Sequence, residues 1–204
     1  SFRNNDLPGV MLAGSFEKFI HRYGVVPETN PVIFTNNSST LSLVKSLVDL
    51  NCKPLAYIDK REEDLIEKNT LDYLKKNKIP TYYDAEIEGC DGRNTIREAS
   101  IRYKSNIIKL KTNMLCVSGG INPDVSLFTQ SKGLIKWDEN LFTFKPDNSF
   151  QNTIVIGSAS GNFDFQKISD EIKNKLSFLK GIKDEKVEII ENVENNYNIC
   201  EIWE

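Results

Sequence analysis

Apolar and polar positions in the first half of the chain predict strands and helices in alternation. The segment 39–50 places its apolar residues on one face, which is typical of a helix packed on a sheet. The segment 63–77 begins with acids and ends with lysines, which suits the dipole of a second helix. Short apolar runs before, between and after them predict strands over residues 32–36, 54–59 and 81–83. A β-α-β-α-β order means a parallel sheet with right-handed crossovers, so residues 31–83 predict a Rossmann-like α/β layer.

The residues before this layer predict a docking segment, 1–30, with one helix. Apolar side chains recur at approximately helical spacing over residues 10–23, and Gly24 follows as a stop signal.

The hydrophobic period changes after residue 84. Short alternating stretches, separated by glycine and polar residues, predict a small three-stranded antiparallel meander over residues 85–88, 95–103 and 107–110. The apolar run 113–117 then predicts a strand that returns to the main sheet. Residues 31–117 thus form one predicted α/β domain with a meander.

The last third of the chain predicts shorter elements. These are a helical turn near 123–129, brief strands at 134–137 and 141–144, a final buried strand at 153–156 and a helix at 162–179 that stops at Gly181. Residues 183–204 contain seven acids and two lysines, and we expect this acidic tail to be weakly ordered on its own.

Composition narrows the function classes. The 204 residues are 39% hydrophobic and 27% charged, as in globular proteins. A net charge of −3 gives no long-range attraction to nucleic acid or to anionic membranes. No apolar run approaches the roughly 20 residues of a membrane-spanning helix, and no signal segment opens the chain. The expected location is therefore the cytoplasm, with no nucleic acid or membrane partner.

Catalytic and metal-binding patterns are missing from the sequence. The chain has no C-x-x-C pair and no G-x-S-x-G serine, and its one histidine, His21, lies on a predicted helix where a structural or exposed role is favoured over that of a base. We therefore expect no catalytic residue and no metal site. The four cysteines are expected to be reduced and buried: Cys52, Cys90, Cys116 and Cys200.

The turn after the first strand of the α/β layer is one candidate nucleotide site. Dinucleotide-binding folds usually carry Gly-x-Gly-x-x-Gly there, but this turn has no glycine. Its candidate contacts are Thr35, Asn36, Asn37 and Ser38. The alternative is that Ser38 or Ser39 simply caps the helix.

Asp59 belongs to the same candidate site. It ends the second strand 22 residues after Asn37, near the roughly 20-residue offset of a ribose-binding acid. The alternative is a strand-end residue that pairs with Lys60 or Arg61.

Two glycine-containing turns form a second candidate site. Each follows an apolar strand, where open α/β sheets bind ligands, and glycine lets the backbone approach a ligand closely. The candidate contacts are Ser118, Gly119, Gly120, Gly157, Ser158, Gly161 and Asn162. The alternative is that these are ordinary glycines of tight turns.

An ordered set of short motifs resembles a known family. The order of elements resembles the pyridine nucleotide disulfide oxidoreductases, and in detail the chain is similar to the α subunit of heterotetrameric sarcosine oxidase over about residues 6–162. The motifs that carry the resemblance are L-P-G-V-M-L-A-G at 7–14, R-Y-G-V at 22–25, F-T-N-N at 34–37, V-S-G-G-I-N-P at 117–123, L-F-T-Q-S at 127–131 and W-D at 137–138.

The resemblance implies a nucleotide-binding scaffold within a complex. Residues 31–117 would be the second dinucleotide-binding-type domain, and residues 118–182 would return to a first domain whose glycine-rich fingerprint precedes Ser1 and binds NAD. The turns at Ser118 and Gly157 would face that nucleotide. Where the family's disulfide reductases have Gly-Asp, this chain has Gly157-Ser158, so the resemblance does not extend to the flavin contact of that acid.

The resemblance also implies partners and a reaction. The family oxidises sarcosine to glycine and hydrogen peroxide, and it passes a one-carbon unit to tetrahydrofolate through a domain downstream of Glu204. The complex holds FAD and FMN and includes β, γ and δ subunits. We expect this segment to be non-catalytic. The alternatives are a subunit-assembly module without nucleotide binding and the α subunit of a related proline or opine dehydrogenase.

Overall fold

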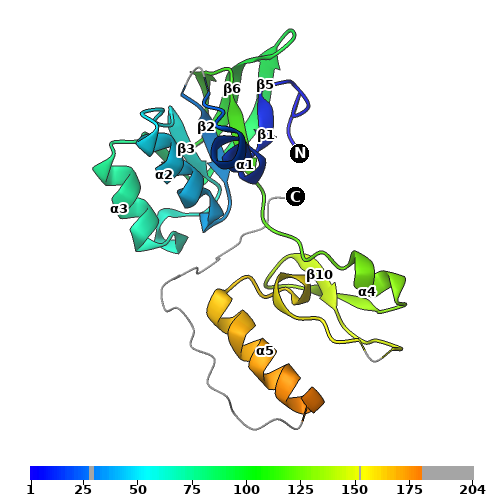
Figure 1. Ribbon diagram of the computed structural model, residues 1–204. Helices are drawn as coiled ribbons and strands as arrows, with labels where there is room; N and C mark the ends of the chain where they lie inside the picture. Colours follow the sequence, from blue (N-terminus) through cyan, green and yellow to red (C-terminus); the bar gives the residue numbers. More distant parts are fainter. Residues whose placement is uncertain (28–29, 152, 181–204) are drawn as a thin grey trace. The chain divides into compact units, whose positions relative to one another are not determined.

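The computed structural model describes residues 1–27, 30–151 and 153–180 (Figure 1). The chain divides into two compact units, the first of which ends at Gly120 while the second begins at Ile121. The predicted acidic tail at 183–204, with Cys200, lies outside the described residues.

A five-stranded parallel sheet is the centre of the first unit. Every neighbouring pair in it is parallel, and β8 lies between β1 and β2. In sheet order the strands are β1 (Val10–Leu12), β8 (Leu115–Ser118), β2 (Val32–Thr35), β3 (Ala56–Asp59) and β4 (Thr81–Tyr83).

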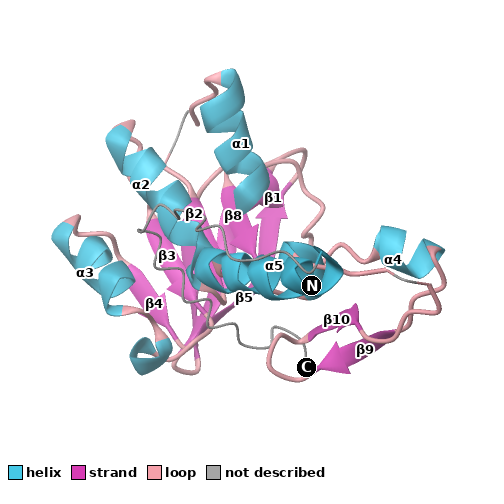
Figure 2. Ribbon diagram, turned by 60° about the horizontal axis from the view of Figure 1, so that its bottom comes forward, coloured by secondary structure: helices cyan, strands magenta, loops and turns pink. Residues whose placement is uncertain are grey.

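Three helices cover one face of this sheet, as Figure 2 shows. They are α1 (Ala13–Tyr23), α2 (Leu41–Asp49) and α3 (Lys68–Lys76), and a 3₁₀ turn precedes each of the last two, η1 (Ser38–Thr40) and η2 (Glu63–Leu65). Phe16 of α1 and Leu47 of α2 are buried in one cluster with Ile33 and Tyr57 of the sheet. Each such side chain stabilises the fold by about 1.5–3 kcal/mol relative to its exposed state.

The opposite face carries the antiparallel meander of β5 (Ala85–Gly92), β6 (Ile96–Tyr103) and β7 (Asn106–Lys111). Side chains alternate along a strand, so Val32 and Phe34 pack toward the meander while Ile33 packs toward the helices. Both faces of β2 are therefore buried, which explains its unbroken apolar run. The predicted α/β layer with a three-stranded meander is confirmed.

The expected helix at residues 10–23 is wrong at its start. Residues Val10–Leu12 form strand β1, paired in parallel with β8, and the helix begins only at Ala13. Helical spacing describes the residues after Ala13 well, but the partner strand lies about a hundred residues later, and no local pattern announces it.

In the second unit, the described elements before the last helix are all short. They are α4 (Ser126–Gln130), an antiparallel pair β9 (Ile135–Asp138) and β10 (Thr143–Pro146), and the 3₁₀ turn η3 (Gly157–Ser160), and the last helix is α5 (Phe165–Lys180). Trp137 and Phe144 meet edge to face with ring centroids 5.2 Å apart, and both are at least 44% exposed.

The expected buried strand at 153–156 is wrong. These residues form no strand, and Ile154 and Ile156 are exposed. An apolar run becomes a strand only when a neighbouring backbone pairs with it, and no such ladder reaches these residues within the described part of the chain. The helix also begins at Phe165 rather than at residue 162.

Other sequence expectations concern single residues. Cys52, Cys90 and Cys116 are buried thiols, as expected. His21 lies exposed on α1, where its Nε2 is 2.9 Å from the Ser46 hydroxyl of α2, which fits the structural role. Among the described residues, no helix is long and apolar enough to cross a bilayer, and no three potential metal ligands cluster.

Candidate functional site

The candidate nucleotide contacts of the first unit meet at the carboxyl edge of the parallel sheet. The chain leaves β2 toward β3 on one side, while β8 lies on the other side. Open α/β sheets bind ligands in the crevice at such a switch point. The turn after β2 and the residues after β8 therefore stand where a dinucleotide normally lies.

Asn37 closes this crevice. Its side-chain oxygen accepts a hydrogen bond from the backbone N–H of Ser39 at 3.0 Å, so Asn37 caps η1. Its amide nitrogen donates to the Ser118 hydroxyl at 3.0 Å and to the Ser118 carbonyl at 3.3 Å. Asn36 adds a 3.4 Å contact to the carbonyl of Gly119. The cap is thus Asn37 rather than Ser38 or Ser39, because the asparagine carbonyl already reaches the free N–H.

The turn also shows why it has no glycine. Thr35, Asn37 and Thr40 have the spacing of the three glycines in Gly-x-Gly-x-x-Gly, and all three are buried. Thr35 donates from its hydroxyl to the carbonyl of Asn37 at 2.8 Å, and the Thr40 hydroxyl lies 3.0 Å from the Tyr57 hydroxyl. Buried side chains with hydrogen bonds of their own therefore hold the positions that glycines hold in the fingerprint.

Asp59 is engaged by Arg61, so the alternative of a strand-end ion pair is confirmed. Arg61 donates to Asp59 from its backbone N–H at 2.9 Å, from Nε at 3.1 Å and from Nη2 at 2.9 Å. The two side chains are 0% and 1% exposed. Burial opposes the charge of Arg61, but its contacts with Asp59 outweigh this and raise the pKa of Arg61. A ribose hydroxyl reaches this carboxylate only if Arg61 moves away.

Glu67 connects the ion pair to the turn. The Ser38 hydroxyl donates to Glu67 and accepts a hydrogen bond from Nη1 of Arg61 at 3.2 Å. The same guanidinium lies 3.8 Å from the Glu67 carboxylate. Ser38 is thereby fixed between a cation and an anion of the chain itself.

The glycine-containing turn of the second unit holds an internal carboxylate. Glu171 of α5 accepts hydrogen bonds from the N–H of Gly157 at 3.2 Å, the hydroxyl of Ser160 at 3.0 Å and the side-chain amide of Asn162 at 2.9 Å. Lys175 donates to its other oxygen at 2.8 Å. Burial alone would raise the pKa of Glu171, but these donors outweigh it and lower the pKa to about 2.

The backbone of this turn requires its glycines. Gly157 and Gly161 have φ angles of +72° and +89°, in the left-handed region that other residues rarely adopt. Ser158 is exposed, and the donors of this turn to Glu171 are Gly157, Ser160 and Asn162. The candidate residues thus fall into two groups, one in each unit, and each group is already bonded to the chain's own side chains.

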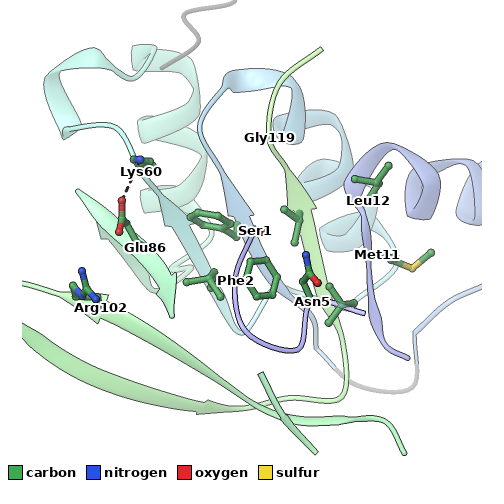
Figure 3. A pocket seen from close by; sticks show the side chains of 13 residues that line it. Ser1, Phe2, Asn5, Met11, Leu12, Lys60, Glu86, Arg102 and Gly119 are labelled. Atoms are coloured by element: carbon green, nitrogen blue, oxygen red, sulfur yellow. Dashed lines mark ion pairs between the residues drawn. The ribbon is translucent and has the colours of Figure 1, made fainter. Parts of the chain in front are cut away.

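Sequence reasoning missed a cleft of about 680 Å³ on the meander side of the first unit (Figure 3). Side chains from the N-terminal segment, the sheet and the meander line it, among them Phe2, Phe34, Lys60, Glu86 and Arg102. These residues come from segments far apart in the chain, so no local motif marks them.

The chain is similar in sequence to sarcosine oxidase α subunits. It is 28% identical over 168 residues to that of Corynebacterium sp. (strain U-96), and 27% identical over 159 residues to that of Rhizobium meliloti (strain 1021). The matches cover 80% and 78% of this chain but only 17% and 15% of the relatives' length. No family model matches the chain.

Solved structures share the fold at low sequence identity. Bacillithiol disulfide reductase Bdr from Staphylococcus aureus superposes with a TM-score of 0.60 at 13% identity, over 88% of this chain and 58% of that one. Thioredoxin reductase of T. acidophilum gives 0.59 at 12% identity, over 89% and 61%. L-proline dehydrogenase from P. horikoshii gives 0.51 at 17% identity, over 78% and 27%. These likenesses show the fold alone. The chain is thus a distant homologue of part of the sarcosine oxidase α subunit, built on the fold of the pyridine nucleotide-disulfide oxidoreductases.

Proposed function

We propose that this chain is a non-catalytic scaffold region in the α subunit of an amine-oxidising flavoprotein of the sarcosine oxidase type. The homology over most of the chain supports the class of protein. One observation carries the scaffold role: the Asn37–Ser118 bridge closes the switch-point crevice of the parallel sheet. A domain whose own side chains fill its nucleotide crevice serves to position the other parts of the complex.

We further propose that residues 118–120 and, taken separately, the turn at 157–162 are NAD contacts, and that the main phosphate-binding site lies elsewhere. Gly119 and Gly120 are exposed at the end of β8. The amide and hydroxyl donors of the turn at 157–162, which bind the carboxylate of Glu171, are of the kind that bind anions. Bound NAD would supply nucleotide recognition or hydride chemistry to the complex. Thr35, Asn36, Asn37, Ser38 and Asp59 have structural roles in this proposal.

The proposal includes the partners that the family implies. The β, γ and δ subunits would bring FAD and FMN, and tetrahydrofolate would accept the one-carbon unit from sarcosine. A cytoplasmic location stays a prediction.

Calorimetric titration of the 204-residue chain with NAD, FAD and ATP tests the scaffold role. We expect no binding in the micromolar range, and no peroxide production from sarcosine by the chain alone. Ser38→Ala should leave the NAD titration unchanged, with Ser42→Ala on the exposed side of α2 as its matched control. Micromolar NAD binding that Ser38→Ala abolishes would place a site at the turn after β2 and refute the proposal. Sarcosine-dependent peroxide from this chain would refute the non-catalytic assignment.

A further inference from the structure

The cleft on the meander side of the first unit has the dimensions of a small-molecule site. Its volume of about 680 Å³ lies within the roughly 300–1,000 Å³ of ligand pockets. It opens beside the carboxyl ends of β1, β8 and β2, on the sheet face opposite the helices. Among the described residues, Gly119 is the one proposed NAD contact that also lines the cleft, and the other lining residues have no role in the NAD proposal.

One end of the cleft is apolar. Val10, Phe34 and Val117 come from three adjacent strands of the sheet, and Ile87 faces them from the meander. Phe2 of the N-terminal segment also lines this apolar end of the cleft (Figure 3). A ligand therefore needs an apolar body of about the size of a phenyl ring to fill this end.

The other end is charged. Lys60 follows β3 and is held at its backbone, where its N–H donates to the carbonyl of Thr35 at 2.9 Å. Its Nζ lies 3.1 Å from the carboxylate of Glu86. Arg102 stands nearby on β6, 59% exposed, and pairs with Glu88, which does not line the cleft.

The charges at this end favour an anion. The lining side chains contribute two cations, Lys60 and Arg102, against the single carboxylate of Glu86. A guanidinium has five N–H donors, so Arg102 can keep Glu88 and still bind a second carboxylate with a pair of hydrogen bonds. The ammonium of Lys60 can likewise hold two acceptors.

We propose that this cleft binds a small monocarboxylate with a phenyl-sized apolar body. The body lies against Val10, Phe34 and Val117. The carboxylate binds to Lys60 and Arg102 beside Glu86, which stands between these two side chains in Figure 3. The ligand is held by non-covalent contacts only. Apart from Gly119, the residues that line this cleft are different from the proposed NAD contacts.

Three probes with one carbon skeleton test the proposal: 3-phenylpropionate, 3-phenylpropan-1-ol and 3-phenylpropylamine. Each is titrated into the full chain and followed by amide chemical shifts. We expect 3-phenylpropionate to bind about tenfold more tightly than the alcohol, since one charge-assisted hydrogen-bond pair separates them. The amine should bind most weakly.

Charge variants locate the carboxylate. Arg102→Gln should weaken 3-phenylpropionate about tenfold and leave the alcohol unchanged. Glu86→Gln should strengthen 3-phenylpropionate, because it removes the competing acid from Lys60. Arg97→Gln is the matched control, since Arg97 is an exposed arginine on the same strand that does not line this cleft.

Several results would overturn the proposal. One is the absence of shifts in the cleft residues at millimolar concentrations of all three probes. Others are equal binding of alcohol and carboxylate, weaker binding after Glu86→Gln, and an equal loss in Arg97→Gln and Arg102→Gln. Because these variants change exposed side chains, they should fold, and thermal unfolding of each checks this.

Discussion

The turn at 35–40 and the turn at 157–162 both follow apolar runs, and both bind a side chain of this chain where a nucleotide contact was expected. They differ in what occupies them. The first is closed by Asn37, an uncharged side chain that is 1% exposed and is held between a helix start and β8. The second is occupied by the carboxylate of Glu171, which is 14% exposed and belongs to a helix packed beside it.

This difference decides which turn can exchange its occupant for a ligand. If Asn37 is removed from the crevice, the buried donors and acceptors that it bonds lose their partner. Each buried polar group left without a partner costs about 1–3 kcal/mol of stability. Glu171 is partly exposed, so water molecules can replace its hydrogen bonds when its carboxylate leaves the turn. A buried neutral bridge is therefore structural, whereas a partly exposed carboxylate marks a place that favours negative charge and can be vacated.

The largest effect is expected at the ion pair that supports the first turn. Arg61→Met leaves the Asp59 carboxylate buried without its cation, and breaking such a pair costs about 3–5 kcal/mol. Urea denaturation should show this loss in the unfolding free energy. Arg93→Met, at an exposed arginine in the β5–β6 connection, serves as control and should stay within about 0.5 kcal/mol of the unsubstituted chain. A loss below 1 kcal/mol in Arg61→Met would contradict the structural role of the pair.

Asn37 itself should show the next largest effect. Asn37→Ala removes the cap of η1 and the bridge to Ser118, at a cost of about 1–3 kcal/mol in unfolding free energy. Asn37→Asp keeps the capping oxygen but loses the donor to Ser118, so its cost should be intermediate. If the aspartate variant is as stable as the unsubstituted chain, the bridge contributes nothing. Chemical denaturation of both variants in parallel gives the answer.

The second turn should tolerate loss of its occupant better. Glu171→Gln keeps the shape but replaces an acceptor with an amide, and we expect a loss of about 1 kcal/mol confined to the second unit. Hydrogen exchange should be faster at Gly157 and unchanged at Ser39. Asp170→Asn, next to it but exposed, is the control. Faster exchange at both turns would show that the stability of one turn depends on that of the other.

The smallest expected effect is the pH response of that turn. The pKa of Glu171 is lowered from its ordinary 4.5 to about 2, so its contribution is complete above the ordinary value and is lost as the pH falls through about 2. Protection of the Gly157 amide should therefore hold at pH 5 and weaken toward pH 2. In Glu171→Gln this additional weakening should be absent. An unchanged pH profile in that variant would show that another group titrates.

The sequence predicted the parts of the fold whose signals are local. The meander and the strands β2, β3 and β4 follow from alternating or unbroken apolar runs with turn residues between them. The first strand, β1, was missed because its partner strand is distant in the chain. The strand expected at 153–156 is absent because an apolar run alone does not supply a neighbouring strand to pair with. Local patterns indicate which residues become buried, but they do not indicate which segments cover those residues.

The candidate sites show the same limit at the level of single residues. Sequence spacing identified Asp59 as a ribose-binding acid or, alternatively, as a strand-end acid that pairs with Lys60 or Arg61, and the pair with Arg61 exists. It gave no indication that Asn37 would reach Ser118, 81 residues away, or that Glu171 would fill the turn at Gly157. The cleft lined by Lys60 and Arg102 depends on packing between a sheet and a meander, which spacing does not encode.

The strand order β1-β8-β2 sets a sequence of events for folding. Because β1 pairs with β8 and not with β2, residues 10–12 must wait until residues 115–118 have been made and placed. During synthesis at about 5–20 residues per second, the chain therefore carries its first strand unpaired for several seconds. Closing that long loop is a late step, so β1 should be the last strand to join the sheet and the first whose amides exchange with solvent.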